Sequence, residues 1–452
     1  MTRIAVIGCG YVGAVSAACF AELGHDVDCI DTDASRIEVL KRGESPIHEP
    51  GLETLLARGV SRGRLHFSSE YPDVFDARVV FIAVNTPESH EGAADIRAVR
   101  DAVTMVAPRL RYGSVIVNKS TVPIGTGELV SGMARRSGSG AISVVSNPEF
   151  LREGSAIRDF MMPDRVVLGS DDPNAIETVA ALYERLEAPV LRTDIRTAEM
   201  IKYASNAFLA TKISFINEIA AICESLGADI SEVARGMGMD ERIGNRFLAA
   251  GLGWGGSCFP KDVRALAHMA AVHGTHPQLL RSVMDINAGQ RLRTVQKVRD
   301  ALGGLDRRRI AILGASFKAD TDDTRNSPAL ELASLLHLEG ASVVVYDPVV
   351  PGDRIKDVVP DVDVAGSVVA AADGADAVIV ATEWQEFLDM DLDVLARTVS
   401  QRLIIDARNL LDPAAVRSAG FEYHCLGRPA REGGPVARLA VDAMPAAAGG
   451  AQ

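Results

Sequence analysis

Ile4-Ala5-Val6-Ile7-Gly8-Cys9-Gly10-Tyr11-Val12-Gly13 is the stretch that decides the fold of the N-terminal part of the chain. Its apolar run predicts a buried strand, and three glycines follow in the spacing G-x-G-x-x-G. An alanine-rich helical pattern then reaches Leu23, Gly24 ends it, and a second strand from Val27 to Ile30 closes with Asp31. A strand, a glycine turn, a helix, a strand and an acid in this order predict a dinucleotide-binding βαβ unit.

The glycines and the acid each have a physical task in such a unit. Gly8 allows the tight turn, Gly10 lets the backbone reach a pyrophosphate at the helix N-terminus, and Gly13 lets helix and strand pack closely. The carboxylate of Asp31 can accept hydrogen bonds from the adenosine ribose, and its charge would repel a 2′-phosphate. We therefore predict NAD rather than NADP as the cofactor. The candidate cofactor residues of this unit are Gly8, Gly10, Tyr11, Val12, Gly13 and Asp31.

The composition narrows the class of protein. A chain of 452 residues is too long for one hydrophobic core, so two or three domains are expected. The net charge of −13 argues against a nucleic-acid surface and an anionic membrane face. The six cysteines form no C-x-x-C pair, which favours free thiols in a reducing cytoplasm, and the nine histidines have no metal-ligand spacing, so we predict no metal. We expect no signal peptide and no membrane span, since no apolar run reaches ~20 residues.

Three further strands are expected, each ending in polar or proline-bearing residues. Arg78 to Val84 ends at Asn85-Thr86-Pro87, Ser114 to Asn118 ends at Lys119-Ser120-Thr121-Val122-Pro123, and Ile142 to Val145 runs into Asn147-Pro148-Glu149-Phe150-Leu151-Arg152-Glu153-Gly154. In an open parallel sheet these carboxyl ends form the ligand crevice. Position therefore makes Thr121, Glu149 and Glu153 site candidates, although ordinary turn and capping chemistry explains them equally well.

A long helix is predicted from Thr197 to about Leu226, where apolar residues recur at helical spacing without a breaker. About 30 residues span roughly 45 Å, which suggests a spine between domains or a subunit interface. Lys202 and Asn206 lie four residues apart and share a face. A lysine in a helix is usually solvated, so an inward functional role for Lys202 stays open.

The second decisive stretch is Gly253-Trp254-Gly255-Gly256-Ser257-Cys258-Phe259-Pro260-Lys261-Asp262. Its glycines let the backbone approach a ligand, and a cysteine in a cationic, partly open site can be held as a thiolate and act as a nucleophile. A buried, inert cysteine beside a turn is the alternative. Helices are expected after it, from Val263 to His273 and from Pro277 to Ala301.

A second alternating series of strands and helices opens at Ile310 to Leu313. Later strands are expected at Val343 to Tyr346, Ala377 to Ala381 and Leu403 to Ile405. Here Gly314-Ala315-Ser316-Phe317-Lys318 replaces the full dinucleotide fingerprint, and the cations of Lys318 and Arg325 would suit a diphosphate or a carboxylate. The tail of residues 430–452 is rich in Ala, Gly and Pro and is expected to be disordered.

Four of these motifs, in this order, resemble the UDP-glucose/GDP-mannose dehydrogenase family. They are the Gly-Tyr-Val-Gly turn, the segment Asn147 to Gly154, Glu199-Met200-Ile201-Lys202-Tyr203 with Asn206, and the segment Gly255 to Asp262. The resemblance covers roughly residues 1–428. It implies an α/β protein with two Rossmann-like, doubly wound domains joined by a helical domain. The expected divisions are 1–196 for NAD, 197–303 for dimerisation and the cysteine loop, 304–429 for the UDP-sugar and 430–452 for the tail.

The resemblance also implies a reaction, the oxidation of the C6 hydroxymethyl group of a nucleotide sugar to a carboxylate with two NAD. Two hydrides must leave, and the aldehyde offers the second only after a nucleophile adds to it. Cys258 would form a thiohemiacetal and then a thioester, with Lys202 and Asn206 stabilising oxyanions. By resemblance, Glu149 is the base for hydrolysis, and Asp262 and Thr121 place water and protons.

Further positions are carried over from the family by motif. The additional NAD contacts are Arg36, Val84, Thr86, Ser120, Thr121, Glu153 and Arg325. The substrate contacts are Glu149, Phe150, Leu151, Arg152, Lys202, Asn206, Arg242, Ala249, Ala250, Gly251, Gly253, Gly255, Lys318 and Arg408.

The sugar is the least determined part of this prediction. Arg242-Ile243-Gly244-Asn245 resembles the UDP-glucose branch, in which the arginine reaches the ligand of the neighbouring subunit, so UDP-glucose and a homodimer or higher even oligomer are expected. Trp254 stands where phenylalanine is more usual, next to the sugar. Alternatives are the same chemistry on GDP-mannose or a UDP-N-acetylhexosamine, a two-electron alcohol dehydrogenase with a structural Cys258, and a non-catalytic nucleotide sensor.

Overall fold

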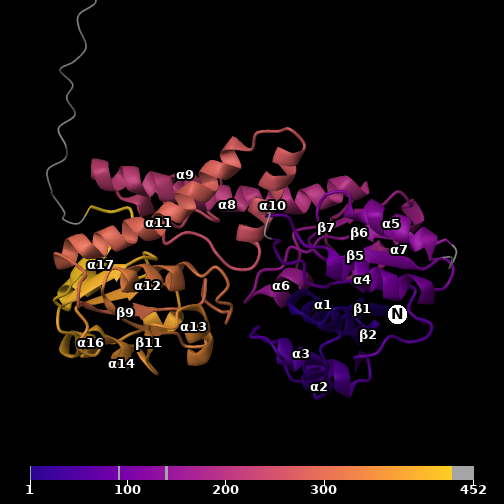
Figure 1. The fold of residues 1–452 in the computed structure, drawn as a ribbon, viewed down its shortest axis with the longest axis horizontal. Helices are drawn as coiled ribbons and strands as arrows, with labels where there is room; N and C mark the ends of the chain where they lie inside the picture. The colour runs from indigo at the N-terminus through magenta and orange to yellow at the C-terminus, as the bar shows by residue number, and fades with distance from the viewer. Residues whose placement is uncertain (1, 90–91, 138–140, 430–452) are drawn as a thin grey trace, which may run out of the picture.

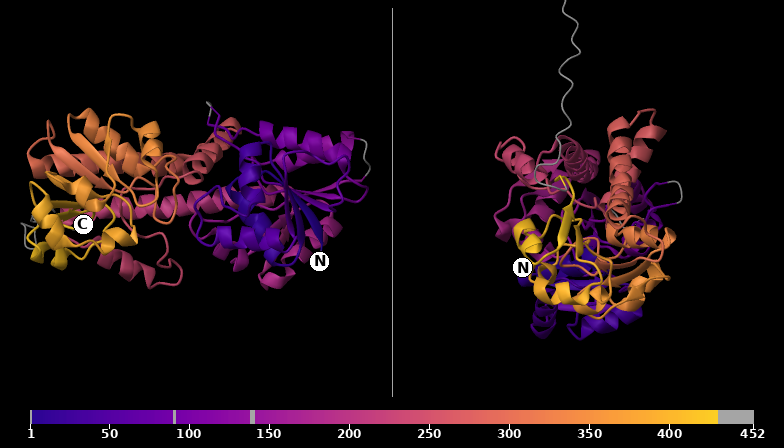
Figure 2. Two further views of the ribbon diagram at one scale, coloured as in Figure 1. Left: turned by 90° about the horizontal axis from the view of Figure 1, so that it is seen from below. Right: turned by 90° about the vertical axis from the view of Figure 1, so that its left-hand side faces the viewer.

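The computed structural model describes residues 2–89, 92–137 and 141–429, and the tail predicted to be disordered lies outside them. Two α/β lobes lie at opposite ends of the molecule, and long helices cross between them (Figure 1). Views from two other sides show the same two lobes with the helices running between them (Figure 2). The predicted fold class, two doubly wound lobes around a helical centre, is confirmed.

The N-terminal lobe is built on an eight-stranded sheet in the order β3-β2-β1-β4-β5-β6-β7-β8. Its neighbouring strands are parallel except β6 and β7. The strands are β1 (Arg3–Ile7), β2 (Asp26–Ile30), β3 (Leu65–Ser68), β4 (Val79–Ile82), β5 (Val115–Asn118), β6 (Ser143–Ser146), β7 (Val166–Gly169) and β8 (Val190–Thr193). The α-helices are α1 (Tyr11–Glu22), α2 (Ala34–Lys41), α3 (Leu52–Ser61), α4 (Arg97–Val106), α5 (Thr126–Arg136), α6 (Ala156–Met161) and α7 (Pro173–Ala180).

The central part is helical and consists of α8 (Ile195–Leu226), α9 (Ile230–Gly238), α10 (Phe259–Val272) and α11 (Gln278–Leu302). The predicted long helix is confirmed, and its 32 residues correspond to roughly 48 Å. The side chain of Asp194 caps its start by accepting from the Thr197 N–H, and Gly227 ends it at φ +79°. Helix α10 begins at Phe259, four residues before the predicted Val263, because Pro260 fits the first turn, where no N–H is needed.

The C-terminal lobe has a six-stranded parallel sheet in the order β11-β10-β9-β12-β13-β14. Its strands are β9 (Arg309–Leu313), β10 (Ser342–Tyr346), β11 (Asp363–Val364), β12 (Ala377–Val380), β13 (Leu403–Asp406) and β14 (Glu422–Cys425). Its helices are α12 (Pro328–Leu338), α13 (Gly352–Val358), α14 (Val368–Ala372), α15 (Gln385–Leu388), α16 (Leu392–Thr398) and α17 (Pro413–Ser418).

The two lobes repeat one turn together with its acid. Gly8 N donates to Ile30 O at 2.8 Å, and Gly314 N donates to Tyr346 O at 2.7 Å, so the same crossover follows the first strand of each sheet. The acid after the second strand of the C-terminal sheet is Asp347, which is buried and accepts from Ala315 N and Ser316 N, as Asp31 accepts from Cys9 N in the N-terminal lobe. Within the described residues, no helix combines the length and apolar character needed to cross a membrane.

Candidate active site

Five of the six candidate catalytic residues come together from three segments. Glu149 follows β6, Lys202 and Asn206 lie in α8, and Cys258 and Asp262 stand at the start of α10. The Lys202 ammonium lies 2.7 Å from the Glu149 carboxylate, and Asn206 Nδ2 donates to Asp262 Oδ2 at 2.6 Å. All four of these side chains are buried, so the inward role left open for Lys202 is the one the structure favours.

Charge at the site is paired within a low-dielectric interior. Burial opposes ionisation of Glu149, but the charge of Lys202, its hydrogen bond and the Leu151 N–H outweigh it and lower the pKa of the carboxyl. Burial opposes the charge of Lys202 in turn, but Glu149 and other nearby anions raise its pKa. Glu149 and Lys202 are therefore both ionised at neutral pH.

The Cys258 thiol differs from the sequence expectation of a thiolate. Cys258 occupies the N-cap position of α10, where the helix dipole favours a negative charge, and Lys202 acts to lower the pKa of the thiol. Burial and the charge of Glu149 act in the opposite direction and raise the pKa to about 11. The thiol is therefore protonated at neutral pH in this arrangement and needs a base before it can attack.

The loop before Cys258 is threaded tightly between the helices and the C-terminal lobe. A β-carbon at Gly253 would stand 2.2 Å from Asn287 Oδ1, and one at Gly255 would stand 2.1 Å from Asn326 O. Close approach thus explains these glycines. Trp254, expected beside the sugar, is only 7% exposed, and its indole N–H donates to Ser214 Oγ at 3.0 Å. The indole belongs to the core between α8, α10 and α11, so it does not line an open pocket in this chain.

The loops after β4 and β5 lie beside this centre and are joined to each other. Thr86 Oγ1 donates to Thr121 O at 2.7 Å, and Ser120 Oγ donates to Val84 O at 2.7 Å. Ser120 and Thr121 line one small cavity together with Lys202. The sixth candidate catalytic residue, Thr121, therefore borders the buried ammonium.

The residues of the glycine turn fit NAD. A β-carbon at Gly13 would stand 1.8 Å from Gly8 O, whereas at Gly10 the nearest atom is Asn85 Oδ1 at 3.5 Å, so the space over the turn is open. No side chain caps α1 and no acid lies in its first turn, which leaves its N–H groups available to a pyrophosphate. Asp31 accepts from Cys9 N at 2.6 Å and pairs with Arg36 at 3.0 Å.

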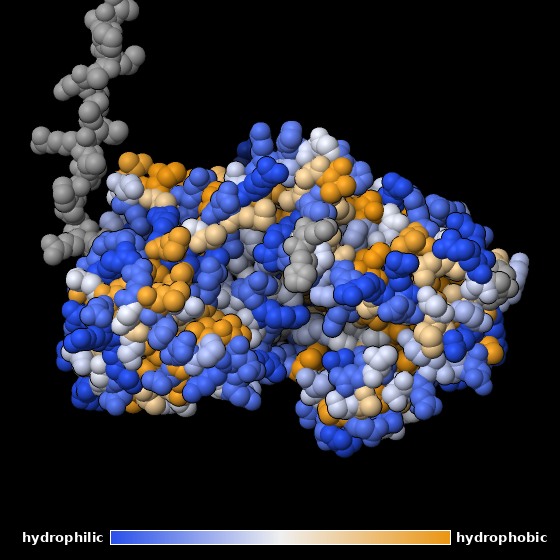
Figure 3. Space-filling view, viewed as in Figure 1, coloured by the Kyte–Doolittle hydropathy of each residue, from blue (hydrophilic) through white to orange (hydrophobic). Residues whose placement is uncertain are grey.

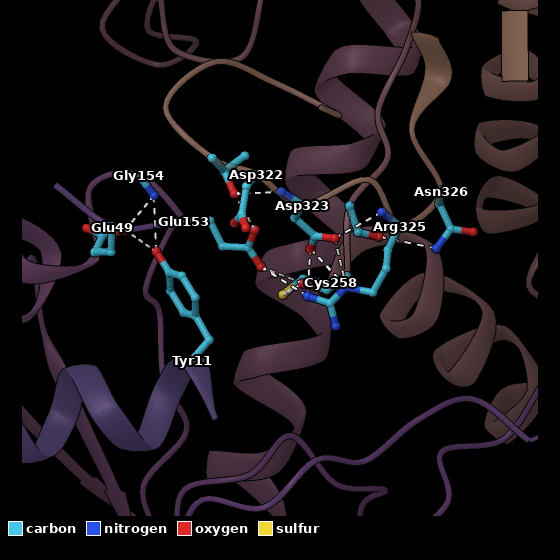
Figure 4. A network of polar contacts seen from close by, with 12 residues as sticks. Tyr11, Glu49, Glu153, Gly154, Cys258, Asp322, Asp323, Arg325 and Asn326 are labelled. Atoms are coloured by element: carbon cyan, nitrogen blue, oxygen red, sulfur yellow. Dashed lines mark hydrogen bonds and ion pairs between the residues drawn. The ribbon is translucent and has the colours of Figure 1, made fainter. Parts of the chain in front are cut away.

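Glu153 is the point where the two lobes meet beside the thiol (Figure 4). Its Oε1 accepts from Ser257 Oγ at 2.9 Å, and its Oε2 accepts from Thr321 Oγ1 at 3.1 Å. Arg325 lies 3.5 Å from the same carboxylate, and Lys318 Nζ donates to the backbone oxygen of Glu153. Burial and the charge of Asp323 raise the pKa of Glu153 to about 7, although Arg325 acts in the opposite direction.

The remaining candidate substrate contacts lie in two groups, one at the C-terminal lobe and one on the N-terminal side, with Arg242 as the exception. Arg408 donates to Ala381 O at 2.8 Å, and a β-carbon at Gly251 would stand 3.5 Å from Arg408 Cδ, which places the loop from Ala249 against this arginine. Asn409 donates to Ala250 O at 3.2 Å in the same loop. The predicted substrate residues at these positions are therefore neighbours.

Arg152 and Phe150 have partners of their own on the N-terminal side. Arg152 pairs with Asp159 at 2.5 Å, and the guanidinium of Arg165 lies 3.7 Å from the centre of the Phe150 ring. Arg242 is the exception, because its side chain is 89% exposed and pairs with Asp240. Lys212 donates to the backbone oxygen of Ile243 and so holds the turn that carries Arg242. Because Lys212 lies ten residues, or about 15 Å, along α8 from Lys202, this turn is distant from the buried Lys202–Glu149 pair.

Sequence reasoning missed Glu49. Its carboxylate is buried, bonds to the Tyr11 hydroxyl and accepts from Gly154 N at 2.6 Å and Ala156 N at 2.8 Å (Figure 4). It thereby ties the dinucleotide turn to the segment that carries Glu153. No local spacing could have revealed this, since Glu49 and Tyr11 are separated by 38 positions.

Signatures of one family match the chain in order. The NAD binding domain of the UDP-glucose/GDP-mannose dehydrogenase family matches residues 2–187, the central domain matches 196–289, and the UDP binding domain matches 311–413. The chain belongs to this family. The recognition made from the four motifs is thereby confirmed, as is NAD as the cofactor, and the protein is an oxidoreductase.

Relatives in this family are similar over nearly the whole chain. UDP-glucose 6-dehydrogenase TuaD of Bacillus subtilis is 46% identical over 436 residues, which cover 96% of this chain and 95% of that protein. The UDP-glucose 6-dehydrogenase of Rhizobium meliloti is 46% identical over 437 residues, covering 94% and 100%. A solved UDP-glucose dehydrogenase from Pyrobaculum islandicum matches with a TM-score of 0.87 and 39% identity, covering 94% of this chain and 97% of that chain.

Proposed function

We propose that this family member oxidises UDP-glucose at C6 to UDP-glucuronate in a four-electron reaction. The observation that carries the proposal is the buried Lys202–Glu149 pair, 2.7 Å apart, beside a cysteine at a helix N-terminus. An alcohol dehydrogenase that stops at the aldehyde needs no nucleophile and no base for hydrolysis. The proximity of a thiol and a carboxylate therefore favours oxidation through to the acid.

Each candidate catalytic residue has one task in this reaction. Lys202 and Asn206 stabilise the negative charge that develops on O6 in both oxidations, since both donors are fixed and buried. The Cys258 sulfur adds to the aldehyde carbon to give a thiohemiacetal, and loss of hydride from C6 leaves a thioester. Glu149 takes a proton from water as it attacks the thioester, and the thiol and the carboxylate product separate. Asp262 and Thr121 orient the protons and the water. NAD, when bound, supplies the hydride acceptor for both oxidations.

The remaining carried-over positions make up the two binding sites. The NAD side is formed by the glycine turn, Asp31, Arg36, the joined loops after β4 and β5, Glu153 and Arg325. The sugar nucleotide lies between the segment from Glu149 to Arg152, the loop from Ala249 to Gly255 and the cations Lys318 and Arg408. Arg408 lies against Gly251 of this loop, and Lys318 reaches across to the backbone oxygen of Glu153, so the two cations suit a diphosphate that bridges the lobes.

Sequence identity to the relatives, rather than similarity of fold, favours UDP-glucose over other nucleotide sugars as the substrate. A solved UDP-D-ManNAc dehydrogenase from Pyrococcus horikoshii matches with a TM-score of 0.85, which is close to the 0.87 of the Pyrobaculum enzyme, but its identity is 27% against 39%. The relatives named for UDP-glucose reach 46%. GDP-mannose and UDP-N-acetylhexosamines are the alternatives that the assay below separates.

A homodimer built on α8 completes the proposal. The exposed residues of this helix include large apolar ones, namely Met200 (44%), Phe208 (65%), Phe215 (43%), Ile222 (47%) and Leu226 (57%). Figure 3 displays hydrophobic surface among the upper helices between the lobes. Covering such a face requires a partner of equal length, and a second α8 supplies one. In such a dimer, the exposed Arg242 of one subunit would contact the ligand bound by the other subunit.

The domain divisions at 196/197 and 303/304 and a cytoplasmic location belong to this proposal as well. The first division falls within the opening turn of α8, and the second follows α11. All six cysteines are free thiols, five of them buried, which suits a reducing compartment.

One assay tests the function. The full chain is mixed with NAD and each of UDP-glucose, UDP-N-acetylglucosamine, UDP-N-acetylmannosamine and GDP-mannose, and NADH formed per sugar is counted. We expect two NADH per UDP-glucose and at least tenfold lower kcat/KM for the others. One NADH per sugar would identify a two-electron dehydrogenase, and no NADH with any sugar would favour a nucleotide sensor.

A further inference from the structure

The proposed reaction leaves the Cys258 thiol without a base. The thiol has a pKa of about 11 in this site, so its proton must be taken by another group before sulfur attacks. Glu149 is bonded to Lys202 and to Leu151 N, and the proposed reaction uses its carboxylate later, on the water that hydrolyses the thioester. Asp262 is held by Asn206 at 2.6 Å and by Lys261 at 2.6 Å.

Ser257 connects the thiol to a third carboxylate. Its Oγ lies 3.5 Å from Cys258 Sγ, within hydrogen-bond range for sulfur, and donates to Glu153 Oε1 at 2.9 Å. The side chain of Glu153 is 10% exposed, and burial with the nearby Asp323 raises its pKa to about 7. A base with a pKa near the working pH is the most effective acceptor.

We propose that Ser257 relays the proton of Cys258 to Glu153, which makes Ser257 a catalytic residue in the function proposed above. The Cys258 S–H proton moves to Ser257 Oγ as the Ser257 hydroxyl proton moves to Glu153 Oε1. The products are a thiolate, an intact serine hydroxyl and a neutral carboxylic acid, so protons and charge balance. The thiolate lies within the electrostatic reach of Lys202 and Arg325, each of which it favours in the cationic form.

The relay depends on the contact between the lobes. Thr321 and Arg325 of the C-terminal lobe hold the Glu153 carboxylate, and Lys318 holds its backbone oxygen. A β-carbon at Gly154 would stand 2.6 Å from Asp320 O, so the two segments are already in contact there. The groups facing Glu153 are thus Ser257 of the central helical part, Tyr11 of the N-terminal lobe, and Thr321, Asp323, Arg325 and Lys318 of the C-terminal lobe. Activation of the thiol would therefore require the loop of the C-terminal lobe to be seated.

Alkylation of the thiol tests the relay without any substrate. Among the cysteines only Cys258 is partly exposed, so iodoacetamide reports on it first. The wild type and Ser257→Ala should both react faster as pH approaches the thiol pKa of about 11, and the wild type should show an additional rise through about 7, because Glu153 becomes an acceptor once it is ionised. Ser257→Ala should lose this rise and react at least ~10-fold more slowly at pH 8. Ser257→Thr, which keeps the hydroxyl, should restore it. A Ser257→Ala profile that matches the wild type would overturn the relay.

A second measurement separates failure of the relay from failure of the proposed function. In a Glu149→Gln background, UDP-glucose and NAD should build up a thioester on Cys258. Loss of the Glu149 charge lowers the thiol pKa there, but Glu149→Gln/Ser257→Ala should still form the adduct more slowly than Glu149→Gln. Equal rates of adduct formation would reject the relay and leave the thioester route intact. An alkylation profile as predicted, with no adduct in Glu149→Gln, would support the relay and reject the proposed reaction. NAD binding, followed by fluorescence, confirms that the Ser257→Ala protein is folded.

Discussion

The ammonium of Lys202 lies 2.7 Å from the carboxylate of Glu149, and the two side chains are only 4% and 5% exposed. A buried pair of this kind gains little over apolar residues of the same size, but removal of one partner leaves an uncompensated charge. Neither residue is therefore retained for stability alone. We interpret the pair as a functional ion pair that the surrounding core holds beside Cys258.

This relationship predicts an asymmetry between single and double variants. Lys202→Met strands the Glu149 carboxylate and should lower the free energy of unfolding by about 3–5 kcal/mol, whereas Lys202→Met/Glu149→Gln should regain most of it without regaining activity. Thermal and urea denaturation at pH 7 measure the effect. A double variant no more stable than Lys202→Met would contradict the pairing.

Lys119 is a buried lysine whose hydrogen-bond partners are uncharged. It lies 3.1 Å from Asn147 Oδ1 and 3.4 Å from the Tyr183 hydroxyl, and burial lowers its pKa from 10.5 to about 8. Because the unfolded lysine keeps its proton to higher pH, this group destabilises the fold below pH 8, and the penalty fades as pH rises towards 10.5.

Lys119→Met should therefore be more stable than the wild type at pH 7, and its advantage should shrink by about 2–3 kcal/mol between pH 7 and pH 10. Denaturant titrations of both proteins at the two pH values measure the difference. Lys41→Met, an exposed lysine paired with Glu38, is the matched control and should show little pH-dependent change. A stability difference for Lys119→Met that is independent of pH would contradict the prediction.

We predict that the choice of NAD over NADP depends on Asp31. Asp31→Ala removes the ribose acceptor, which is worth on the order of 1.5–3 kcal/mol, and frees Arg36 for a 2′-phosphate. We expect weaker NAD binding and a smaller gap between NAD and NADP in kcat/KM. Asp172→Ala, which removes the cap of α7, is the control that should leave the ratio unchanged. An Asp31→Ala protein with the native ratio would show that another group selects the cofactor.

The dimer prediction concerns Arg242 and the exposed face of α8. Light scattering should give a dimer, and Arg242→Ala should raise the KM for UDP-glucose much more than the KM for NAD, since the residue lies away from its own Cys258 site. Phe208→Glu places a charge on the 65% exposed position and should favour monomers with lower activity. A fully active monomer at micromolar concentration would exclude a shared site.

Much of the fold could be predicted because its signals are local. The glycine turn, the second strand with Asp31 and the long apolar helix each follow from spacing within one segment, and all three lie where expected. Strands β3, β7, β8, β11 and β14 were not predicted, and none of them is longer than four residues. Half-exposed or polar residues give β8 and β14 no apolar run, whereas the short apolar run of β7 cannot be told from a buried helix segment by its pattern.

The candidate site was predictable only in part. Motif order supplied Lys202, Asn206 and Cys258, but the protonation of the thiol depends on burial and on the field of Glu149, which no spacing encodes. The tie from Glu49 to Tyr11 and the bond from Ser257 to Glu153 likewise join distant segments. Such contacts become visible only when the chain is folded.

The central claim is the covalent route through Cys258, and intact-mass spectrometry of Glu149→Gln tests it most directly. With UDP-glucose and NAD, this variant should release up to two NADH per site and then stop, because water is no longer activated and the thioester remains on Cys258. Cys258→Ala should form no adduct and lose the conversion of aldehyde to acid, by on the order of a millionfold in kcat. Absence of any adduct in Glu149→Gln, together with a Cys258→Ala enzyme that still makes UDP-glucuronate at the normal rate, would contradict the account.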